Sequence, residues 1–142
     1  RLEIAKAMGA KGAYNLRETN VTEAMADATG DDGFDVVGEA TGLPVSFLNA
    51  IEASAFGGVI ALIGNGTRDV TFNQSSLIKK ELDVVGSRNS LHAFQPLVRL
   101  LQTDAVDIAP IRTSVRPFAQ TVEAIQELRE HPDRNIKILI EF

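Results

Sequence analysis

The stretch GGVIALIG, residues 57–64, is the clearest strand signal in the chain. It is a continuous, β-branched apolar run, which is typical of a parallel strand covered on both faces. A second apolar run, FDVVG at residues 34–38, lies between turn residues and predicts another buried strand. Between them, Pro44 stands where a first-turn proline belongs and apolar residues follow at helical spacing. Strand, helix and strand in this order predict a parallel sheet with a covering helix.

The alternation of helix and strand continues on both sides of this unit. Asn20 and Glu23 form the sequence pattern of a capping box, and we expect a helix from there to Gly30. We expect the helix after Pro44 to end at Gly57. The other expected elements are helices at 2–8, 75–80 and 94–102 and strands at 13–15, 70–72 and 82–86. The pattern predicts an α/β fold with an open, doubly wound parallel sheet.

After Thr103 the pattern changes to loop and strand at 104–118, an amphipathic helix at 119–131 and a closing strand at 136–142. The apolar stripe of that helix consists of Phe118, Val122, Ile125 and Leu128. We therefore divide the chain into residues 1–103, part of a sheet domain, and residues 104–142, a tail in a different structural layer.

Composition excludes several classes of function. The 142 residues are 44% hydrophobic, enough for one compact core, and 14 basic against 19 acidic side chains give a charge of -5. This balance argues against nucleic-acid or anionic-membrane binding. No apolar run approaches the roughly 20 residues of a membrane span, and the absence of cysteine excludes disulfides and thiolate metal sites. We expect a soluble cytoplasmic chain whose two histidines, His92 and His131, are surface residues.

Ligands of open parallel sheets bind beyond the carboxyl ends of the strands. Three segments follow predicted strands: GEATG at 38–42, IGNG at 63–66 and GSRNS at 86–90. Their glycines allow a ligand to approach the backbone closely, or equally serve ordinary tight turns. Ser87, Arg88 and Asn89 can bind an amide or a phosphate, whereas Asn89 and Ser90 can also cap a helix. Lys79 to Glu81 should form an exposed charged face, and the chain lacks the G-x-G-x-x-G, P-loop, G-x-S-x-G and H-E-x-x-H motifs.

The chain resembles the second half of the medium-chain, zinc-dependent alcohol and polyol dehydrogenases. The resemblance follows the order of five segments: RLEIAKAMGAKGAYN, DVVGEATG, GGVIALIG, KKELDVVGSRNS and IKILIEF. It implies a Rossmann-like sheet, of family strand order 3-2-1-4-5-6, without its first two strands. KKELDVVGSRNS is most similar to the sorbitol and sugar-acid branch. That branch oxidises secondary alcohols with NAD or NADP and assembles as dimers or tetramers.

The resemblance also implies a cofactor surface. Its residues are Arg1 near the adenosine ribose, Thr41 and Gly42 beside that ribose, Ile63, Gly64 and Asn65 near the nicotinamide, Val85, Gly86, Ser87 and Arg88 at the carboxamide, and Lys137 at the pyrophosphate. Lys137 has a competing interpretation. If Ile136, Ile138 and Ile140 point inward, period-two alternation places Lys137 on the opposite face.

The family's glycine-rich fingerprint and its zinc-bearing catalytic domain have no counterpart in this sequence. We therefore expect no metal ligands here, and a chain that alone neither binds dinucleotide tightly nor turns over an alcohol. A sheet without its first two strands exposes an edge, which predicts a displaced strand or strand-mediated self-association. The alternative is a complete, non-enzymatic module, either flavodoxin-like or for oligomerisation. A flavodoxin-like site needs an acidic or phosphate-binding cluster after the first strand, where AYNLRET offers only Glu18.

Overall fold

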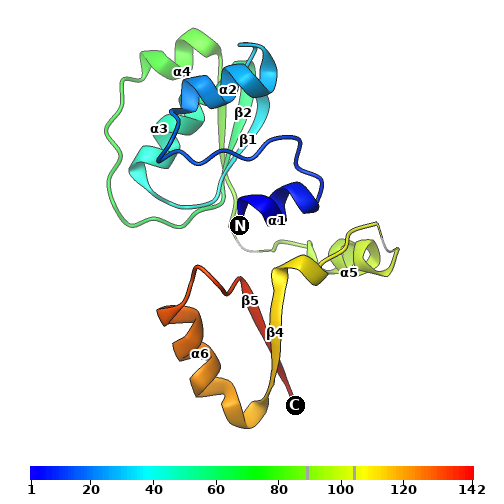
Figure 1. Cartoon of the computed structure of the whole chain (residues 1–142). Helices are drawn as coiled ribbons and strands as arrows, with labels where there is room; N and C mark the ends of the chain where they lie inside the picture. Colours follow the sequence, from blue (N-terminus) through cyan, green and yellow to red (C-terminus); the bar gives the residue numbers. More distant parts are fainter. Residues whose placement is uncertain (89, 104) are drawn as a thin grey trace. The chain divides into compact units, whose positions relative to one another are not determined.

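The computed structural model describes residues 1–88, 90–103 and 105–142. The chain forms two compact units (Figure 1). One is the continuous segment Tyr14–Leu91, and the other combines Arg1–Ala13 with His92–Phe142. The predicted boundary at residue 103 stays a prediction.

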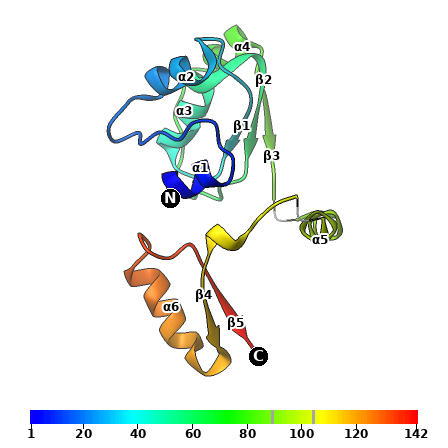
Figure 2. The ribbon, with the colours of Figure 1, turned by 45° about the vertical axis from the view of Figure 1, so that its right-hand side comes forward.

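The segment Tyr14–Leu91 contains a three-stranded parallel sheet in the order β1-β2-β3. Its strands are β1 (Phe34–Glu39), β2 (Ser54–Leu62) and β3 (Asp83–Gly86), and its helices are α2 (Val21–Thr29), α3 (Pro44–Ala53) and α4 (Ser75–Lys80). Figure 2 shows the three strands side by side. Helix α3 packs on β1 and β2, and α2 packs on α3. The predicted alternation and the α/β fold are confirmed.

The core lies on one face of this sheet. Ile60 of β2 is fully buried against Ala50 and Ile51 of α3, and Leu77 of α4 packs on the same cluster. On the opposite face Val36 is 70% exposed. Cover on both faces was expected for β2. In the described residues of this unit, α3 and α4 share one face, because successive right-handed crossovers between neighbouring strands return to the same side.

Helix α3 ends earlier than predicted, at Ala53, and β2 begins at Ser54. The Ser54 hydroxyl donates to the Ala50 carbonyl at 2.7 Å. The Lys80 ammonium donates to the carbonyl oxygens of Ile51, Glu52 and Ser54 at 3.1, 2.7 and 2.8 Å. The prediction that Lys80 belongs to an exposed charged face is therefore wrong. Its ammonium group caps the C-terminal end of α3 instead. Gly57, with a φ of +71°, lies in the bulge where the β1–β2 register shifts.

Two short strands predicted from the sequence are absent from the described structure. Residues 13–15 and 70–72 have no strand partner there. Tyr14 instead donates from its hydroxyl to Asp27 of α2 at 2.7 Å, and the Phe72 ring meets Phe47 of α3 edge-on at 5.4 Å. Side-chain packing on helices replaces a backbone ladder in both segments. The predicted capping box of Asn20 and Glu23 is confirmed.

The other unit holds the predicted strand–helix–strand tail. Its elements are α1 (Leu2–Ala7), α5 (Phe94–Gln102), β4 (Arg112–Pro117), α6 (Thr121–Glu130) and β5 (Lys137–Glu141), with short 3₁₀ turns at Ala109–Ile111 and Phe118–Gln120. Strands β4 and β5 pair in parallel. The Thr113 hydroxyl accepts from the backbone N–H groups of Ile136 and Lys137 at 2.8 and 3.1 Å, which fixes the start of β5.

Helix α6 does not turn its predicted apolar stripe inward. Val122 and Ile125 are 64% and 60% exposed, whereas Ala124 is 3% exposed. The small alanine lets the helix approach β4 and β5 closely, and Arg116 of β4 pairs with Glu127 of α6 at 3.2 Å on that side. None of the helices in the described residues combines the length and the hydrophobicity that a membrane span requires.

Candidate functional site

The loops that follow β1 and β2 are joined at the carboxyl edge of the sheet. The backbone N–H groups of Ile63 and Gly64 both donate to the main-chain oxygen of Glu39 at 2.8 Å. A Cβ added to Gly42, Gly64 or Gly66 would overlap the backbone of the facing loop. These glycines therefore allow two backbones to touch, which accounts for them without a ligand. The same contact brings the predicted segments at Thr41 and Ile63 into one surface.

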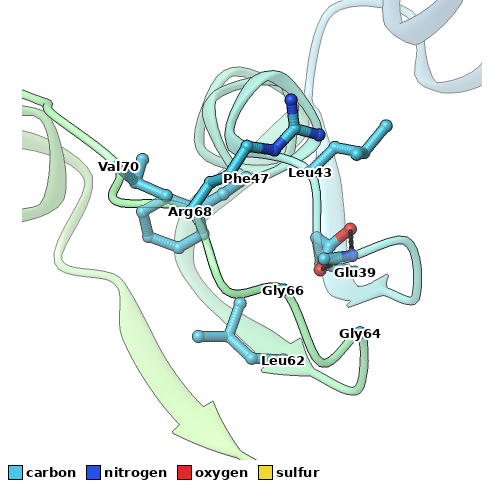
Figure 3. A pocket seen from close by; sticks show the side chains of 9 residues that line it. Glu39, Leu43, Phe47, Leu62, Gly64, Gly66, Arg68 and Val70 are labelled. Carbon is cyan, nitrogen blue, oxygen red and sulfur yellow. Dashed lines mark hydrogen bonds between the residues drawn. The ribbon is translucent and has the colours of Figure 1, made fainter.

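Glu39 is the residue of this surface that the sequence analysis missed. It is 4% exposed, and its carboxylate accepts four hydrogen bonds. Oε1 accepts from the Thr41 N–H, the Thr41 hydroxyl and the Gly42 N–H at 2.8, 2.6 and 3.0 Å, and Oε2 accepts from the Gly42 N–H at 3.1 Å. Figure 3 shows the Glu39 side chain with a hydrogen bond drawn to its carboxylate. The signal was available: a carboxylate followed at two and three residues by the N–H groups of a tight turn is a capping geometry.

These contacts favour the ionised form of Glu39. Burial by itself penalises the charge, but the hydrogen bonds from Thr41, Ser46 and Gly42 lower the pKa of this carboxyl below its ordinary value of 4.5. The Thr41 hydroxyl also accepts from the Leu43 N–H at 3.0 Å, so the hydrogen-bond network around Glu39 extends to the start of α3. The turn is thus built around a fixed negative charge.

A small hollow of about 140 Å³ lies beside this surface, at the ends of β2 and β3. Its lining residues are Ile63, Gly64, Asn65, Ser87 and Arg88. The Ser87 N–H donates to the Leu62 carbonyl at 2.9 Å, which holds the two strand ends together. A Cβ on Gly86 would meet nothing within 4 Å, so this glycine borders open space. The structure therefore brings the predicted residues of the second and third segments together. Asn89 lies outside the described residues.

A second pocket, of about 200 Å³, opens on the α3 side of the Gly64 loop (Figure 3). Glycines and apolar side chains form most of it, and its charged members are Glu39 and Arg68. The lining residues are Glu39, Gly42, Leu43, Phe47, Leu62, Gly64, Gly66, Arg68 and Val70. The buried Glu39 carboxylate belongs to its wall.

Of the three predicted cationic contacts, Arg1 and Lys137 lie in the other unit, whereas Arg88 lies in Tyr14–Leu91. Arg1 donates from Nη2 to the carbonyl oxygens of Pro132 and Asn135 at 2.7 and 3.5 Å. Lys137 is exposed on β5, while Ile136 and Ile138 are half-buried. The period-two alternation is therefore confirmed. It places Lys137 in solvent and leaves its contact with a pyrophosphate a prediction.

The resemblance implies two bound groups, a zinc ion and a dinucleotide, and the described residues fit these groups to different degrees. They contain no cluster of three or more His, Cys, Asp or Glu side chains able to hold a metal ion, so zinc has no fitting site in this part of the chain. The joined loops fit part of a dinucleotide better. They offer exposed main chain, open space at Gly86 and the polar side chains of Asn65, Ser87 and Arg88.

The sequence profile of the zinc-binding dehydrogenase family matches residues 1–103. The chain belongs to this family. It is 29% identical over 138 residues to an uncharacterized zinc-type alcohol dehydrogenase-like protein of Haemophilus influenzae, covering 97% of this chain and 40% of that protein. It is 35% identical over 115 residues to an L-threonine 3-dehydrogenase of Paraburkholderia phytofirmans, covering 80% of this chain and 33% of that enzyme.

Solved structures of dehydrogenases share the fold. L-idonate 5-dehydrogenase from Escherichia coli K-12 superposes with a TM-score of 0.86 at 26% identity, over 99% of this chain and 40% of that enzyme. An alcohol dehydrogenase from E. coli CFT073, solved with NADH, gives a TM-score of 0.90 at 23% identity, over 99% and 41%. The predicted resemblance and the Rossmann-like α/β fold are confirmed. The chain spans 33 to 41% of the length of these relatives.

Proposed function

We propose that this chain supplies one wall of the cofactor cleft in a zinc-dependent NAD(P) oxidoreductase. The substrate class is a secondary alcohol, a polyol or a sugar acid. The observation that carries the proposal is the joining of the strand-end loops at Thr41 and Ile63 in a member of the zinc-binding dehydrogenase family. Relatives named for threonine and idonate support a small polar substrate. A fold neighbour solved with NADH supports a nicotinamide dinucleotide, NAD or NADP, as the cofactor.

Each segment of the surface has a separate role in this proposal. Thr41, whose side chain is exposed, and Gly42 contact the adenosine ribose. Residues 63–65 lie along the nicotinamide, which is the hydride acceptor when bound. Ser87 and Arg88 donate to the carboxamide oxygen, and Gly86 leaves room for that group. These residues hold and orient the ring, and the chain's own contribution to hydride transfer is positioning.

Arg1 and Lys137 are proposed as further cofactor contacts, within their own unit. Both are cationic, and Arg1 carries the fork of donors suited to ribose and phosphate oxygens. Lys137 keeps the charge for the pyrophosphate without the bidentate geometry of an arginine. Residues 104–142 would lead toward the catalytic domain.

We further propose that the chain by itself binds dinucleotide weakly and has no dehydrogenase activity. Zinc has no fitting ligands in the described residues, so the metal and the proton-transfer groups come from elsewhere in an enzyme of this family. We expect self-association, because β1 is an edge strand of its sheet and carries exposed apolar side chains.

Titration with NADH followed by two-dimensional NMR tests the proposal. Millimolar NADH should shift the amide signals of residues 41–42, 63–65 and 85–88 without saturating. Arg88→Ala should weaken this response, whereas Arg99→Ala, on α5 in the other unit, serves as the charge-matched control. Saturable micromolar binding would contradict the claim of weak binding, and shifts confined to other residues would refute the cofactor surface.

Sedimentation tests the proposed self-association separately. The chain should sediment as a dimer or larger species whose population rises with protein concentration. Val36→Lys, which places a charge on the exposed face of the edge strand, should shift the population toward monomer. A wild-type chain that stays monomeric at all concentrations would exclude this part of the proposal.

A further inference from the structure

Glu39 contacts both loops of the candidate site, through different atoms. Its carboxylate accepts the Thr41 and Gly42 N–H groups, in the loop after β1. Its main-chain oxygen accepts the Ile63 and Gly64 N–H groups, in the loop after β2. In the cofactor surface proposed above, the first loop serves the adenosine end and the second serves the nicotinamide end. Glu39 therefore contacts both the loop proposed for the adenosine end of the cofactor and the loop proposed for its nicotinamide end.

The side-chain contacts require an ionised carboxylate. Oε1 alone accepts three hydrogen bonds, at 2.6 to 3.0 Å, and Oε2 accepts the Gly42 N–H. A neutral acid or an amide would present a donor to at least one of these donors. That donor would stand at the position of Oε2 and face the Gly42 N–H, and at 4% exposure little solvent is available to separate the two. Loss of the charge should therefore move the turn rather than only weaken it.

Movement of the turn reaches the second loop directly. A Cβ on Gly64 would overlap the main chain of Gly42 and Thr41, and Gly42 and Gly66 exclude a Cβ from each other in the same way. Such a contact transmits a backbone shift because no side chain lies between the loops to absorb it. Among the described residues that line the adjoining pocket, Arg68 is the other charged side chain, and it forms no ion pair with Glu39.

We propose that Glu39 is a positioning residue whose ionised side chain sets the geometry of both loops at once. This inference rests on the proposed function for its meaning in cofactor binding. It implies that the adenosine and nicotinamide ends of the surface lose their alignment together. The side chain of Thr41 acts at one end only, since its hydrogen bonds with Glu39 and Leu43 stay within the first loop.

A pH titration of the wild-type chain by two-dimensional NMR tests the geometric part without any variant. The amide signals of Gly42, Ile63 and Gly64 should change with one common midpoint, below the ordinary carboxylate range. Glu39→Gln should abolish this transition, while Asp35→Asn, which removes an exposed acid from the same strand, should retain it. Separate midpoints, or a transition at Gly42 alone, would overturn the inference. Glu39→Gln at neutral pH should also shift the signals of both loops.

Binding of NADH tests the functional part. With Glu39→Gln, the NADH-induced shifts at residues 41–42 and at residues 63–65 should weaken together by about tenfold, as expected when a buried charged acceptor is lost. Asp35→Asn removes an exposed acid of the same strand that lies outside the cofactor surface, and it should retain the wild-type response. Weakening at one end alone would overturn the inference. If wild-type NADH shifts are absent from both loops, the proposed function fails, whereas the common pH midpoint still reports on Glu39.

Discussion

Replacement of Lys80 by methionine should destabilise the unit formed by Tyr14–Leu91. The methionine keeps most of the apolar stem, so the change removes the ammonium group and little packing. That group now donates to three carbonyl oxygens at the end of α3, from Ile51, Glu52 and Ser54. Lys79 precedes it on α4 but is exposed, so Lys79→Met is the matched control.

The size of the effect follows from these contacts. A hydrogen bond to a charged group contributes about 1.5–3 kcal/mol, and a cation at a helix C-terminus about 0.3–1 kcal/mol. Lys80 is half-exposed, so water replaces part of what is lost, and we expect a decrease of about 2 kcal/mol in the free energy of unfolding. For a unit of this size that corresponds to a fall in Tm of roughly 10 °C.

Urea denaturation followed by far-UV circular dichroism measures this loss. The chain has no tryptophan, so the signals of the buried Ile60 methyl groups in NMR spectra should be followed in parallel to report on this unit. Lys79→Met should stay within about 0.5 kcal/mol of the wild type, as is usual for surface changes. Equal effects of Lys80→Met and Lys79→Met would refute the assignment of Lys80 as the cap of α3.

Three further substitutions, with Val122→Ala as a comparison for one of them, test the remaining contacts. Gly64→Ala should lower stability by at least about 3 kcal/mol in urea titrations, because its Cβ would overlap the facing backbone, and a change under 1 kcal/mol would contradict that packing. The stability difference between wild type and Glu39→Gln should be full above pH 4.5 and shrink as the pH falls through the lowered pKa of Glu39; a pH-independent difference would argue against an ionised carboxylate. Ile60→Ala should cost about 2–5 kcal/mol in thermal unfolding, whereas Val122→Ala should cost under about 1 kcal/mol.

Features of the fold that depend on neighbouring residues could be predicted from the sequence. The capping box at Asn20, the first-turn Pro44 and the apolar run of β2 are all local signals, and each is confirmed. Features that depend on distant partners could not. Residues 13–15 have strand-like composition, yet Tyr14 bonds to α2, and no periodicity reveals that choice. Sequence spacing also gave the stripe on α6 without showing that Ala124 would face the strands.

The candidate site was located by topology rather than by a motif. Carboxyl ends of neighbouring parallel strands must lie together, so residues 41–42, 63–66 and 87–88 were expected at one edge, and they lie there. The capping contacts of Glu39 are local and could have been predicted, but its burial and the contact of its main-chain oxygen with Ile63 and Gly64 depend on residues far along the chain. The same limit applies to Lys80, since its acceptors are 26 to 29 residues away in the sequence.

The path of the chain between its two units has a consequence for helix α1. Arg1–Ala13 and His92–Phe142 form one unit, while the whole of Tyr14–Leu91 forms the other, so the second unit is an insertion within the first. Helix α1 has no buried residue, and Arg1 is held by two carbonyl oxygens near β5. When the insertion Tyr14–Leu91 unfolds, the chain that connects α1 with His92 is no longer folded and becomes a long flexible tether. The entropy of that tether opposes the return of α1 to its place, so loss of the inserted unit should release α1 as well.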